Sequence, residues 1–521
     1  MRRIRNGWLP HAVVAALAGA GIAWFGPPGI DLAAHVYQRT FFVEHGFQLW
    51  NNYWYAGRYS FVGYSLLYYP LAALIGIKLL AVGTASLSAA AFSVLVAREW
   101  PDAGRWPAWT FTAITPLGIL TGAYPYALGL SLALVALTAL RVRRTVLFAI
   151  ATVLSFAASP LAFVLLFLVL LAATAVSRFR IAPTIVVALV GSAGAILQRL
   201  FPDGGRFPFP PAELGAVLVF CTLGFGFTLR VPAARLLNRF FAVYAFASLL
   251  AFAVPTAVGE NIARLRFVAL PLAVLALALR RWRPVVPAAC ALLLAGAWNI
   301  TPLAFGAARA GADPSANAAY WTPAIHFLRG RVEPGFRVEA VDTAGHWEAV
   351  YLPQAGIPIV RGWFRQEDFP TNALLYRRLR SVPYERWLHR LGVKYVVLTD
   401  AQPDYSAKRE ALLLRGGVLP LVFEANGIRI YEVPDASSIA PGAHVLRLTP
   451  EGVTLALPHN GTYALSVRYS PYWHPSAGCV TRAADGMTIL TAPRGTVRLR
   501  FAVNADSLVA AGTGSSSACA S

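Results

Sequence analysis

The sequence predicts a polytopic α-helical membrane protein that carries an extracytoplasmic C-terminal domain with an α/β region and a β-sandwich. Two features of its composition predict this class. The chain of 521 residues is 57% hydrophobic with a mean hydropathy of +0.55. Only 13% of it is charged, whereas soluble domains are about 25% charged. The apolar excess therefore has to face lipid, and it is arranged in segments of membrane-spanning length.

About eleven apolar segments approach the length of about 20 residues that a helix needs to cross a bilayer. They are residues 8–25, 84–98, 106–120, 127–140, 145–158, 160–177, 182–198, 212–229, 240–256, 264–279 and 284–303. The shorter ones are acceptable because helix tilt and local thinning relax the length requirement. The first segment follows a basic start, as a signal peptide does, but it ends in Gly-Pro-Pro without a small-residue cleavage site. We expect a retained helix there.

The distribution of charge sets the predicted orientation. The formal net charge is +21, which would suggest a nucleic-acid partner in a soluble chain. If the N-terminus is cytoplasmic, the inner connections hold sixteen arginines, namely Arg2, Arg3, Arg5, Arg98, Arg105, Arg141, Arg143, Arg144, Arg178, Arg180, Arg230, Arg235, Arg239, Arg280, Arg281 and Arg283. The outer connections hold six: Arg39, Arg58, Arg199, Arg206, Arg264 and Arg266. The positive-inside rule then predicts a multi-pass plasma-membrane protein with no nucleic-acid partner, and an odd number of spans places the C-terminal domain outside.

The chain divides into three predicted regions. Residues 1–303 form the membrane domain, with an external loop at 26–83. Residues 304–440 form an α/β region, which follows a small and polar linker at 304–315. Its strands are expected at 337–342, 393–398 and 428–433, and a helix at 384–391. Residues 441–521 alternate in the manner of antiparallel strands and predict the β-sandwich.

The external loop concentrates ionisable and aromatic side chains. Asp31 and His35 are four residues apart and share a face if the segment is helical. Arg39 comes one turn later and Glu44 follows it. The aromatic residues of the loop suit the headgroup layer of a membrane, and residues 66–82 look like a helix in the outer interface. We expect a platform on the membrane surface.

This loop resembles that of the GT-C class of membrane glycosyltransferases. The resemblance rests on Asp31, His35 and Arg39, on the region Trp50–Gly57, and on Tyr69-Pro70-Leu71 at the start of an interfacial helix. The chain is also similar to actinobacterial-type bacterial membrane proteins whose domain label mentions 6-pyruvoyl-tetrahydropterin synthase. No residue pattern in the sequence supports pterin chemistry.

The GT-C resemblance implies a reaction and a site. Members of the class take a sugar from a polyprenyl-phosphate carrier and transfer it to an acceptor outside the cytoplasm, here a cell-envelope glycan or glycolipid. An acid in the first loop accepts the proton of the acceptor hydroxyl, which implies Asp31 as the base and makes His35, Arg39 and Glu44 candidates for substrate binding. Asp31 is also a favoured N-cap for a helix that begins at Leu32, and the two roles are compatible.

A second candidate group lies at the outer end of a predicted span. It contains Glu260, Asn261, Arg264 and Arg266. Arginines near hydrocarbon need a partner or water, and a guanidinium can hold a lipid-linked phosphate with two hydrogen bonds. The alternative is structural, with Glu260 and Arg264 paired across one α-helical turn and Arg266 extended to the headgroups.

The outer domain suggests one covalent link and no metal site. Cys479 and Cys519 are predicted to form a disulfide in the extracytoplasmic domain, whereas Cys221 and Cys290 fall within spans. His346, Glu348 and His474 do not have a compact metal-ligand spacing. We therefore expect no metal site in this domain and no certain cofactor. Use of a divalent cation by the protein remains an open possibility.

Two other functional classes fit parts of the pattern. A noncatalytic scaffold or glycan-binding protein explains everything except the acid, histidine and arginines clustered at the outer surface. A lipid or solute transporter would place polar groups near mid-membrane and often has repeated halves, and the sequence shows no convincing repeat. The glycosyltransferase is favoured over both.

Overall fold

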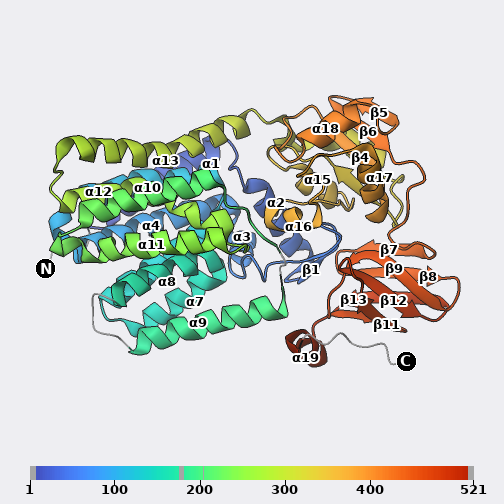
Figure 1. Ribbon diagram of the computed structural model, residues 1–521, viewed down its shortest axis with the longest axis horizontal. Coiled ribbons are helices and arrows are strands. Elements are labelled where there is room, and N and C mark those ends of the chain that lie inside the picture. Colours follow the sequence, from blue (N-terminus) through green and yellow to red (C-terminus); the bar gives the residue numbers. More distant parts are fainter. Residues whose placement is uncertain (1–6, 175–180, 203–204, 514–521) are drawn as a thin grey trace. The chain divides into compact units, whose positions relative to one another are not determined.

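The computed structural model describes residues 7–174, 181–202 and 205–513, and these form two compact units (Figure 1). The first unit contains residues up to 35 together with 64–195 and 206–312. The second contains 36–63, 196–205 and the chain from 313 onward. Helix α2, Leu32–His45, has its first turn in one unit and the remainder in the other. These units differ from the predicted domains, whose boundary lies at 303 and which leave the whole external loop with the helices.

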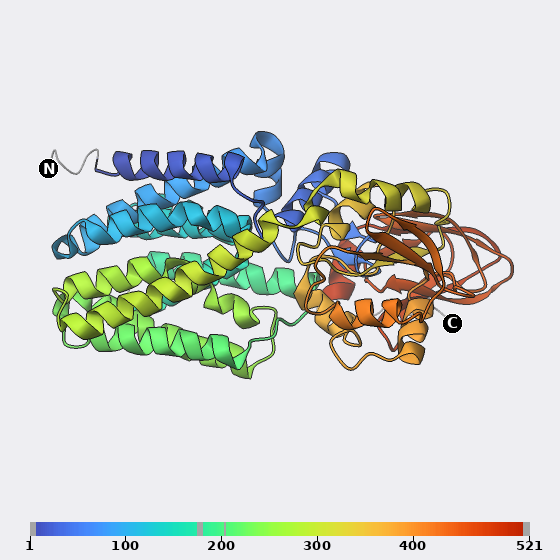
Figure 2. The same cartoon turned by 90° about the horizontal axis from the view of Figure 1, so that it is seen from above.

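The first unit is a bundle of helices (Figures 1 and 2). Its elements are α1 Leu9–Phe25, α3 Tyr68–Ile75, α4 Ile77–Glu99, η2 Pro101–Ala103, α5 Trp106–Ile114, η3 Thr115–Thr121, α6 Tyr124–Arg141, α7 Thr145–Ala158, α8 Pro160–Thr174, α9 Ile181–Leu200, α10 Pro211–Thr228, η4 Pro232–Ala234, α11 Arg235–Ala253, η5 Gly259–Val268, α12 Ala269–Leu279 and α13 Val285–Gly311. Among the described residues, seven helical segments are long and apolar enough to cross a membrane, and α1, α7 and α8 are shorter apolar helices. Each of the eleven predicted segments contains a helix.

Small residues let these helices approach one another. A Cβ on Gly129 of α6 would lie 2.6 Å from the Cβ of Ala162 on α8. At the same place Ser155 of α7 donates a hydrogen bond of 2.8 Å to the carbonyl of Gly129. Such contacts are typical of membrane bundles, in which close packing replaces the hydrophobic driving force between helices.

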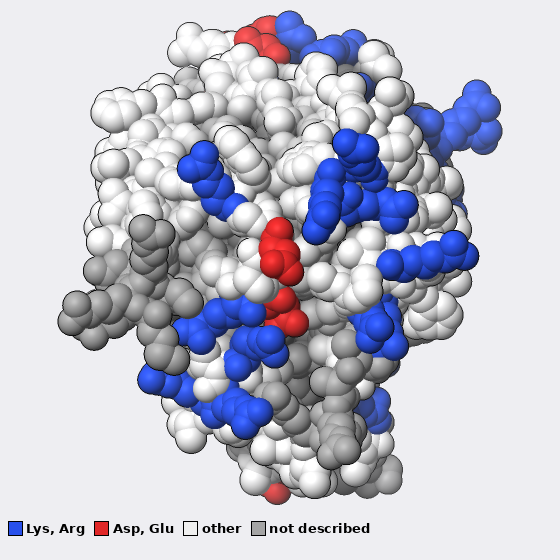
Figure 3. All heavy atoms as spheres, turned by 90° about the vertical axis from the view of Figure 1, so that its left-hand side faces the viewer, with Lys and Arg blue, Asp and Glu red and all other residues white. Residues whose placement is uncertain are grey.

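Basic side chains gather at one end of the bundle. Figure 3 shows Lys and Arg spread over this face with few acidic side chains between them. Arg141 at the end of α6 pairs with Glu99 at the end of α4, with 2.8 Å between Nε and Oε2. Arg280 after α12 donates to the carbonyl of Leu229 after α10 at 3.4 Å. Among the described residues, helix ends that the positive-inside rule grouped together therefore lie on one face.

Two sequence expectations about helix limits are corrected. The predicted interfacial helix at 66–82 is only α3, because Gly76 with φ +86° interrupts it and α4 begins at the next residue. The predicted linker at 304–315 is largely the last part of α13, which continues to Gly311. Its alanines, which suggested a small-residue linker, are the strongest helix formers.

The second unit contains a mixed four-stranded sheet in the order β3-β4-β6-β5. Strand β3 is parallel to β4, and the other neighbours are antiparallel. The strands are β3 Arg337–Ala340, β4 Val393–Thr399, β5 Leu421–Ala425 and β6 Ile428–Glu432. The accompanying helices are η6 Pro314–Ala316, α14 Ala318–Leu328, α15 Glu348–Gln354, α16 Arg365–Thr371, α17 Ser381–Arg390 and α18 Lys408–Arg415. The predicted strands near 337, 393 and 428 and the helix near 384 are present.

Two antiparallel sheets follow, in the orders β10-β13-β8-β7 and β11-β12-β9. Their strands are β7 His444–Thr449, β8 Gly452–Leu457, β9 Gly461–Arg468, β10 Trp473–Pro475, β11 Cys479–Arg482, β12 Met487–Ala492 and β13 Gly495–Phe501, and helix α19 covers Ala505–Thr513. Leu455 and Val497 from the first sheet and Leu465 and Leu490 from the second share one core. A sandwich results, because each sheet buries alternate residues against the other.

The central part of the aromatic loop packs into the second unit. Residues 36–63 belong to the second unit, where β1 Trp50–Asn51 pairs with β2 Arg58–Tyr59. Trp50 is 1% exposed and stacks on Phe501 with 5.2 Å between ring centroids. Trp54 is fully buried and donates to the carbonyl of Ala349 at 3.0 Å. Aromatic residues with polar tips suit a buried protein contact as well as a headgroup layer, so their pattern alone did not separate the two.

The cysteines agree with the prediction as far as they are described. Cys479 is disulfide-bonded. Its predicted partner, Cys519, lies outside the described residues. Cys221 is free and buried in α10, and Cys290 is free on the exposed surface of α13. The pairing itself therefore stays a prediction.

Candidate functional site

Asp31 is held by its backbone at the end of the bundle opposite the arginine-rich face. Its amide donates to the carbonyl of Thr121 at 3.0 Å, and the amide of Ile30 donates to Leu120 at 3.1 Å. The segment that precedes α2 thus pairs with the end of η3, immediately before α6 begins. This pairing places the Asp31 side chain, which is half-buried, at the start of α2.

Two glycines make this pairing sterically feasible. Gly122 has φ +71°, a conformation that glycine adopts without strain. A Cβ at this position would lie 2.6 Å from the backbone nitrogen of Asp31. On the other segment, a Cβ on Gly29 would lie 2.8 Å from the carbonyl oxygen of Ile119. The position of the carboxylate therefore depends on two residues that have no side chain.

His35 lies one helical turn after Asp31 and is completely buried. Its Nδ1 shares a hydrogen bond of 3.2 Å with the hydroxyl of Tyr69. The rings of Tyr68 and Tyr124 each stand 5.5 Å from the imidazole, centroid to centroid. Burial lowers the pKa of His35 to about 3, partly opposed by the backbone of Gly122. The imidazole is therefore neutral at physiological pH and serves this site as a dipole, without a positive charge.

Arg264 reaches the same group of side chains from η5. Its guanidinium carbon lies 5.3 Å from the centre of the Tyr126 ring, and its Nε donates to the amide oxygen of Asn261 at 3.1 Å. Arg264 interacts electrostatically with His35, and Asp31 does so with Tyr124. The structure thus gathers an acid, a neutral histidine and an arginine around the two tyrosines that open α6.

Glu260 and Arg266 form a separate ion-pair group. Arg266 Nη1 lies 3.4 Å from Glu213 Oε2 and 3.8 Å from Glu260 Oε1. The structural alternative had paired Glu260 with Arg264, four residues on. The segment is a 3₁₀-helix of ten residues, in which residues three apart are aligned. Asn261 therefore meets Arg264, and Glu260 lines up with Arg266 two turns later.

The remaining two predicted residues are not among these side chains. Arg39 and Glu44 lie on the part of α2 that belongs to the second unit. Glu44 is exposed and stands 3.9 Å from the exposed His45. Their predicted contact with substrate stays untested. In the first unit, Asp31, His35, Asn261 and Arg264 are the predicted residues that the structure brings together.

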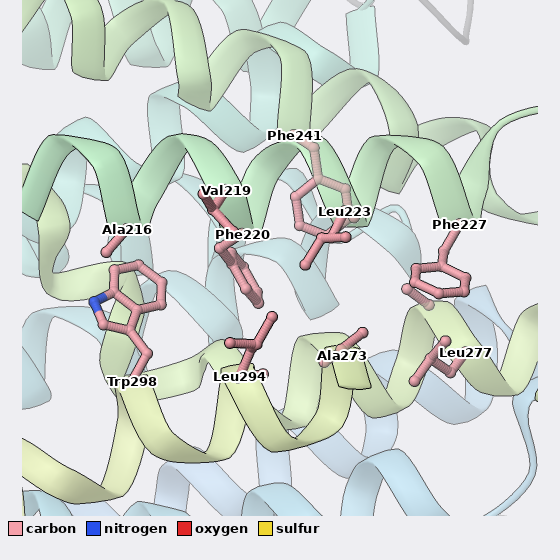
Figure 4. Close-up of a pocket in the computed structure, with 14 residues that line it drawn as sticks. Ala216, Val219, Phe220, Leu223, Phe227, Phe241, Ala273, Leu277, Leu294 and Trp298 are labelled. Atoms are coloured by element: carbon pink, nitrogen blue, oxygen red, sulfur yellow. The ribbon is translucent and has the colours of Figure 1, made fainter. Parts of the chain in front are cut away.

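Two of the cavities within the described bundle differ in character. One of about 70 Å³ is lined by Thr121, Tyr124 and Tyr126, and by apolar residues of α4, α5 and η5. It shares Tyr124 and Tyr126 with the group around Asp31. The other, of about 140 Å³, lies among α10, α11, α12 and α13, where Phe220, Leu294 and Trp298 point into it (Figure 4). Its lining contains no ionisable side chain. It suits hydrocarbon and cannot carry out proton transfer.

Comparisons with known proteins address the fold. No protein-family model matches the chain, and no curated protein matches it. Among solved structures, a cryo-EM structure of a mutant form of the arabinofuranosyltransferase AftD from mycobacteria superposes with a TM-score of 0.50 and 18% sequence identity. A second class of the same mutant gives a TM-score of 0.48 and 19% identity, and covers 84% of this chain and 42% of that chain.

The chain resembles a GT-C membrane glycosyltransferase in fold. The superposition with a TM-score of 0.50 covers 83% of this chain, and this chain spans only 42% of AftD. At 18% identity the likeness concerns the arrangement of the chain and not the identity of its reactive residues. The expected GT-C architecture is supported at the level of a helical membrane region followed by a domain of mixed helices and sheets.

Sequence reasoning did not single out the residues that position Asp31. The segment 121–126 is the outer connection between the predicted spans 106–120 and 127–140, and it supplies Gly122, Tyr124 and Tyr126. A glycine just before a Tyr-Pro-Tyr helix start was the available signal. Its meaning depended on a partner segment some ninety residues earlier in the sequence, which local patterning does not show.

A compact set of possible metal ligands lies in the second unit. Asp342, His346 and Glu348 are buried, and one ligand atom from each lies within 4.8 Å of the others. Sequence reasoning had considered His346 and Glu348 with His474. The third residue is instead Asp342, which stands just after β3.

Proposed function

We propose that this chain is a membrane glycosyltransferase that transfers a sugar from a polyprenyl-phosphate donor to an acceptor outside the cytoplasm. The observation that carries the proposal is that Asp31 and Arg264 lie by neighbouring tyrosines at the start of α6, Asp31 by Tyr124 and Arg264 by Tyr126. The two residues come from opposite ends of the bundle's sequence, and each provides a group that glycosyl transfer needs. The GT-C-like fold supports the same reaction class.

Asp31 is proposed as the base. The acceptor hydroxyl gives its proton to the carboxylate as its oxygen attacks the anomeric carbon, and the bond from this carbon to the phosphate oxygen breaks. Polyprenyl phosphate leaves with the bonding electron pair. Its developing negative charge needs a cation in place before the reaction, and Arg264 is the proposed group.

His35 is proposed to position the acceptor. It is neutral, and its ring is fixed by Tyr69 and by the tyrosines around it. A neutral imidazole next to the base can share a hydrogen bond with a sugar hydroxyl without drawing the proton away from Asp31. Asn261 fixes Arg264 through its amide oxygen.

The decisive experiment compares two Asp-to-Asn variants in purified protein reconstituted in lipid. Wild type is incubated with a panel of radiolabelled polyprenyl-phosphate sugars that begins with a pentofuranose, because the similar structure is named an arabinofuranosyltransferase. Asp31→Asn is expected to lower turnover by about 10²-fold or more while donor binding survives. Asp102→Asn, at an exposed carboxylate next to α4, is the matched control and should retain full turnover.

Three results would contradict the proposal. Wild type that consumes none of the donors would favour a scaffold. Accumulation of unchanged substrate in sealed vesicles would favour transport. Full turnover in Asp31→Asn would remove Asp31 as the base.

We also propose a plasma-membrane location with the arginine-rich face in the cytoplasm. The concentration of arginines on this face supports it. A cysteine introduced at Arg143 should react with an impermeant thiol reagent only from the cytoplasmic side. Labelling of that position from the outside would place Asp31 in the cytoplasm and overturn the donor and acceptor assignment.

A further inference from the structure

The turn that connects β3 to α15 holds three ligand-type side chains in one place. Asp342 follows β3, Glu348 begins α15, and His346 lies between them with a φ of +55°. That conformation is unusual for a residue with a side chain. The amide of His346 donates to the carbonyl of Thr343 at 3.1 Å, so the turn is closed and the imidazole is directed back toward Asp342.

The distances between the three ligand-type side chains are close to those between the ligands of a bound metal ion. His346 Nδ1 lies 3.6 Å from Asp342 Oδ2 and 3.6 Å from Glu348 Oε1. Ligands about 2.0–2.2 Å from a tetrahedral ion are roughly 3.3–3.6 Å apart. The three ligand atoms are all within 4.8 Å of one another, so small side-chain movements are enough to enclose an ion.

Two of these atoms are buried without a partner. Within the described part of the chain, neither Glu348 Oε1 nor His346 Nδ1 has a hydrogen-bond partner. Glu348 is 1% exposed, and a buried polar atom without a partner is costly. Its other oxygen accepts from the hydroxyl of Thr343 at 2.8 Å, which fixes the carboxylate with Oε1 facing the imidazole.

The surroundings have a surplus of carboxylates. Arg361 Nη2 lies 2.7 Å from Asp342 Oδ2 and 2.6 Å from Asp368 Oδ2, and Arg365 pairs with Asp404 at 3.0 Å. These two arginines face six acidic side chains: Asp342, Glu348, Asp368, Asp404, Glu339 and Glu410. Arg361 repels a cation at Asp342, but the carboxylates outnumber the guanidiniums, so the environment favours additional positive charge.

We propose that Asp342, His346 and Glu348 bind a divalent first-row transition-metal ion, Zn²⁺ or Mn²⁺, that holds the β3–α15 turn in place. One imidazole nitrogen with two carboxylate oxygens suits these ions better than Ca²⁺, which prefers six to eight oxygens. A third carboxylate near the imidazole is Asp404, whose Oδ1 lies 3.9 Å from His346 Nε2. This distance is beyond hydrogen-bond range, so Asp404 acts on the imidazole electrostatically. The site is independent of the proposed glycosyl transfer.

The test uses the full-length protein in lipid nanodiscs after treatment with a chelator. Zn²⁺, Mn²⁺, Mg²⁺ and Ca²⁺ are added separately, and bound metal is counted by mass spectrometry after gel filtration. Wild type is expected to retain one Zn²⁺ or Mn²⁺ per chain and to melt at a higher temperature when loaded. Mg²⁺ and Ca²⁺ are expected to bind at least about 10-fold more weakly.

Matched glutamate variants locate the ion. Glu348→Gln should weaken binding by about 100-fold or more, since it removes a ligand, whereas Glu424→Gln, at an exposed glutamate on β5, should bind as wild type does. If Glu348→Gln fails to fold, pulsed electron paramagnetic resonance of Mn²⁺-loaded wild type decides. It should show coupling to one imidazole nitrogen that is lost in His346→Gln. Absence of saturable binding, equal binding by Glu348→Gln, or bound Mn²⁺ without nitrogen coupling would overturn the proposal.

Discussion

Arg264 lies in the first unit, the helical unit, and Arg361 lies in the second unit, the mixed unit of helices and sheets. The two residues show different uses of an arginine away from bulk water. The described contacts of Arg264 are with neutral groups, the amide of Asn261 and the ring of Tyr126. Arg361 is 1% exposed and stands within 4 Å of carboxylates of Asp342, Asp368 and Glu410. An arginine among neutral groups keeps its charge for a ligand, whereas one among carboxylates stabilises the protein itself.

The acidic side chains of the two units also differ in their surroundings. In the mixed unit, burial raises the pKa of Glu410 to about 7, and the opposing charge of Arg361 does not cancel this rise. Asp31 is half-buried at a helix start, next to a neutral histidine. Substitutions should therefore affect stability in the mixed unit and function in the helical unit.

The largest effect is expected from Arg361→Met. Removing this guanidinium leaves at least three buried carboxylates without their cation, which should lower the free energy of unfolding of the mixed unit by about 3–5 kcal/mol. Arg429→Met is the control, because its pair with Glu424 is exposed on both sides and such pairs contribute about 0–1 kcal/mol. Denaturant titration followed by limited proteolysis measures both. Equal stability of the two variants would show that the buried cluster is not held by Arg361.

Gly122→Ala should come next. The new Cβ meets the backbone nitrogen of Asp31 and also requires a positive φ, which together should cost about 1–3 kcal/mol of stability. Turnover should fall as well, because the base is displaced. Gly118→Ala on η3, where a Cβ meets nothing within 4 Å, should change neither the melting temperature nor turnover. A normal rate in Gly122→Ala would separate Asp31 from the reaction.

Arg264→Lys should weaken donor binding by about 10-fold with little change in melting temperature, because lysine keeps the charge but loses the planar fork. Arg266→Lys should lower the melting temperature and leave donor binding unchanged, since Arg266 connects Glu213 and Glu260. Donor titration by scintillation proximity and thermal unfolding distinguish the two patterns. If both variants lose stability and bind donor normally, both arginines are structural.

The smallest effect concerns pH. The pKa of His35 is about 3 in the folded protein because of burial, against 6.5 as its ordinary value. Between these values the unfolded chain binds more protons, so stability is lost as the pH falls through this window. Wild type should lose about 0.7 kcal/mol more than His35→Gln between pH 7 and pH 6. Identical pH dependence of the two proteins would show that His35 is accessible to protons in the folded state.

Much of the helical unit was predictable, because its signals are local. Apolar length located a helix in each of the eleven segments, and arginine counts grouped their ends correctly on one face. Asp31 and Arg264 were expected at the opposite end by counting spans, and the structure places Asp31 by Tyr124 and Arg264 by Tyr126 at the start of α6. Long-range contacts were not predictable, and they assign residues 36–63 to the second unit.

The misses have specific physical causes. The expected Glu260–Arg264 pair assumed 3.6 residues per turn, whereas the segment is a 3₁₀-helix in which Asn261 is aligned with Arg264, so the assumed geometry was wrong and the pair itself stays a prediction. Asp342 was not grouped with His346 and Glu348, because the three approach one another only through a turn with positive φ. Sequence spacing predicts which residues are close within a regular helix or strand. It does not predict which residues a tight turn brings together.

The 3₁₀ form of Gly259–Val268 also affects the depth of Arg264 in a bilayer. The segment Gly259–Leu279 has 21 residues, and as a continuous α-helix it would rise about 32 Å. With its first ten residues in 3₁₀ form, at about 2.0 Å per residue, it rises about 37 Å. Hydrocarbon is about 30 Å thick, so this stretch of chain has several ångströms to spare. As a membrane span, this segment would therefore hold the guanidinium closer to the phosphate layer than an α-helix with the same number of residues.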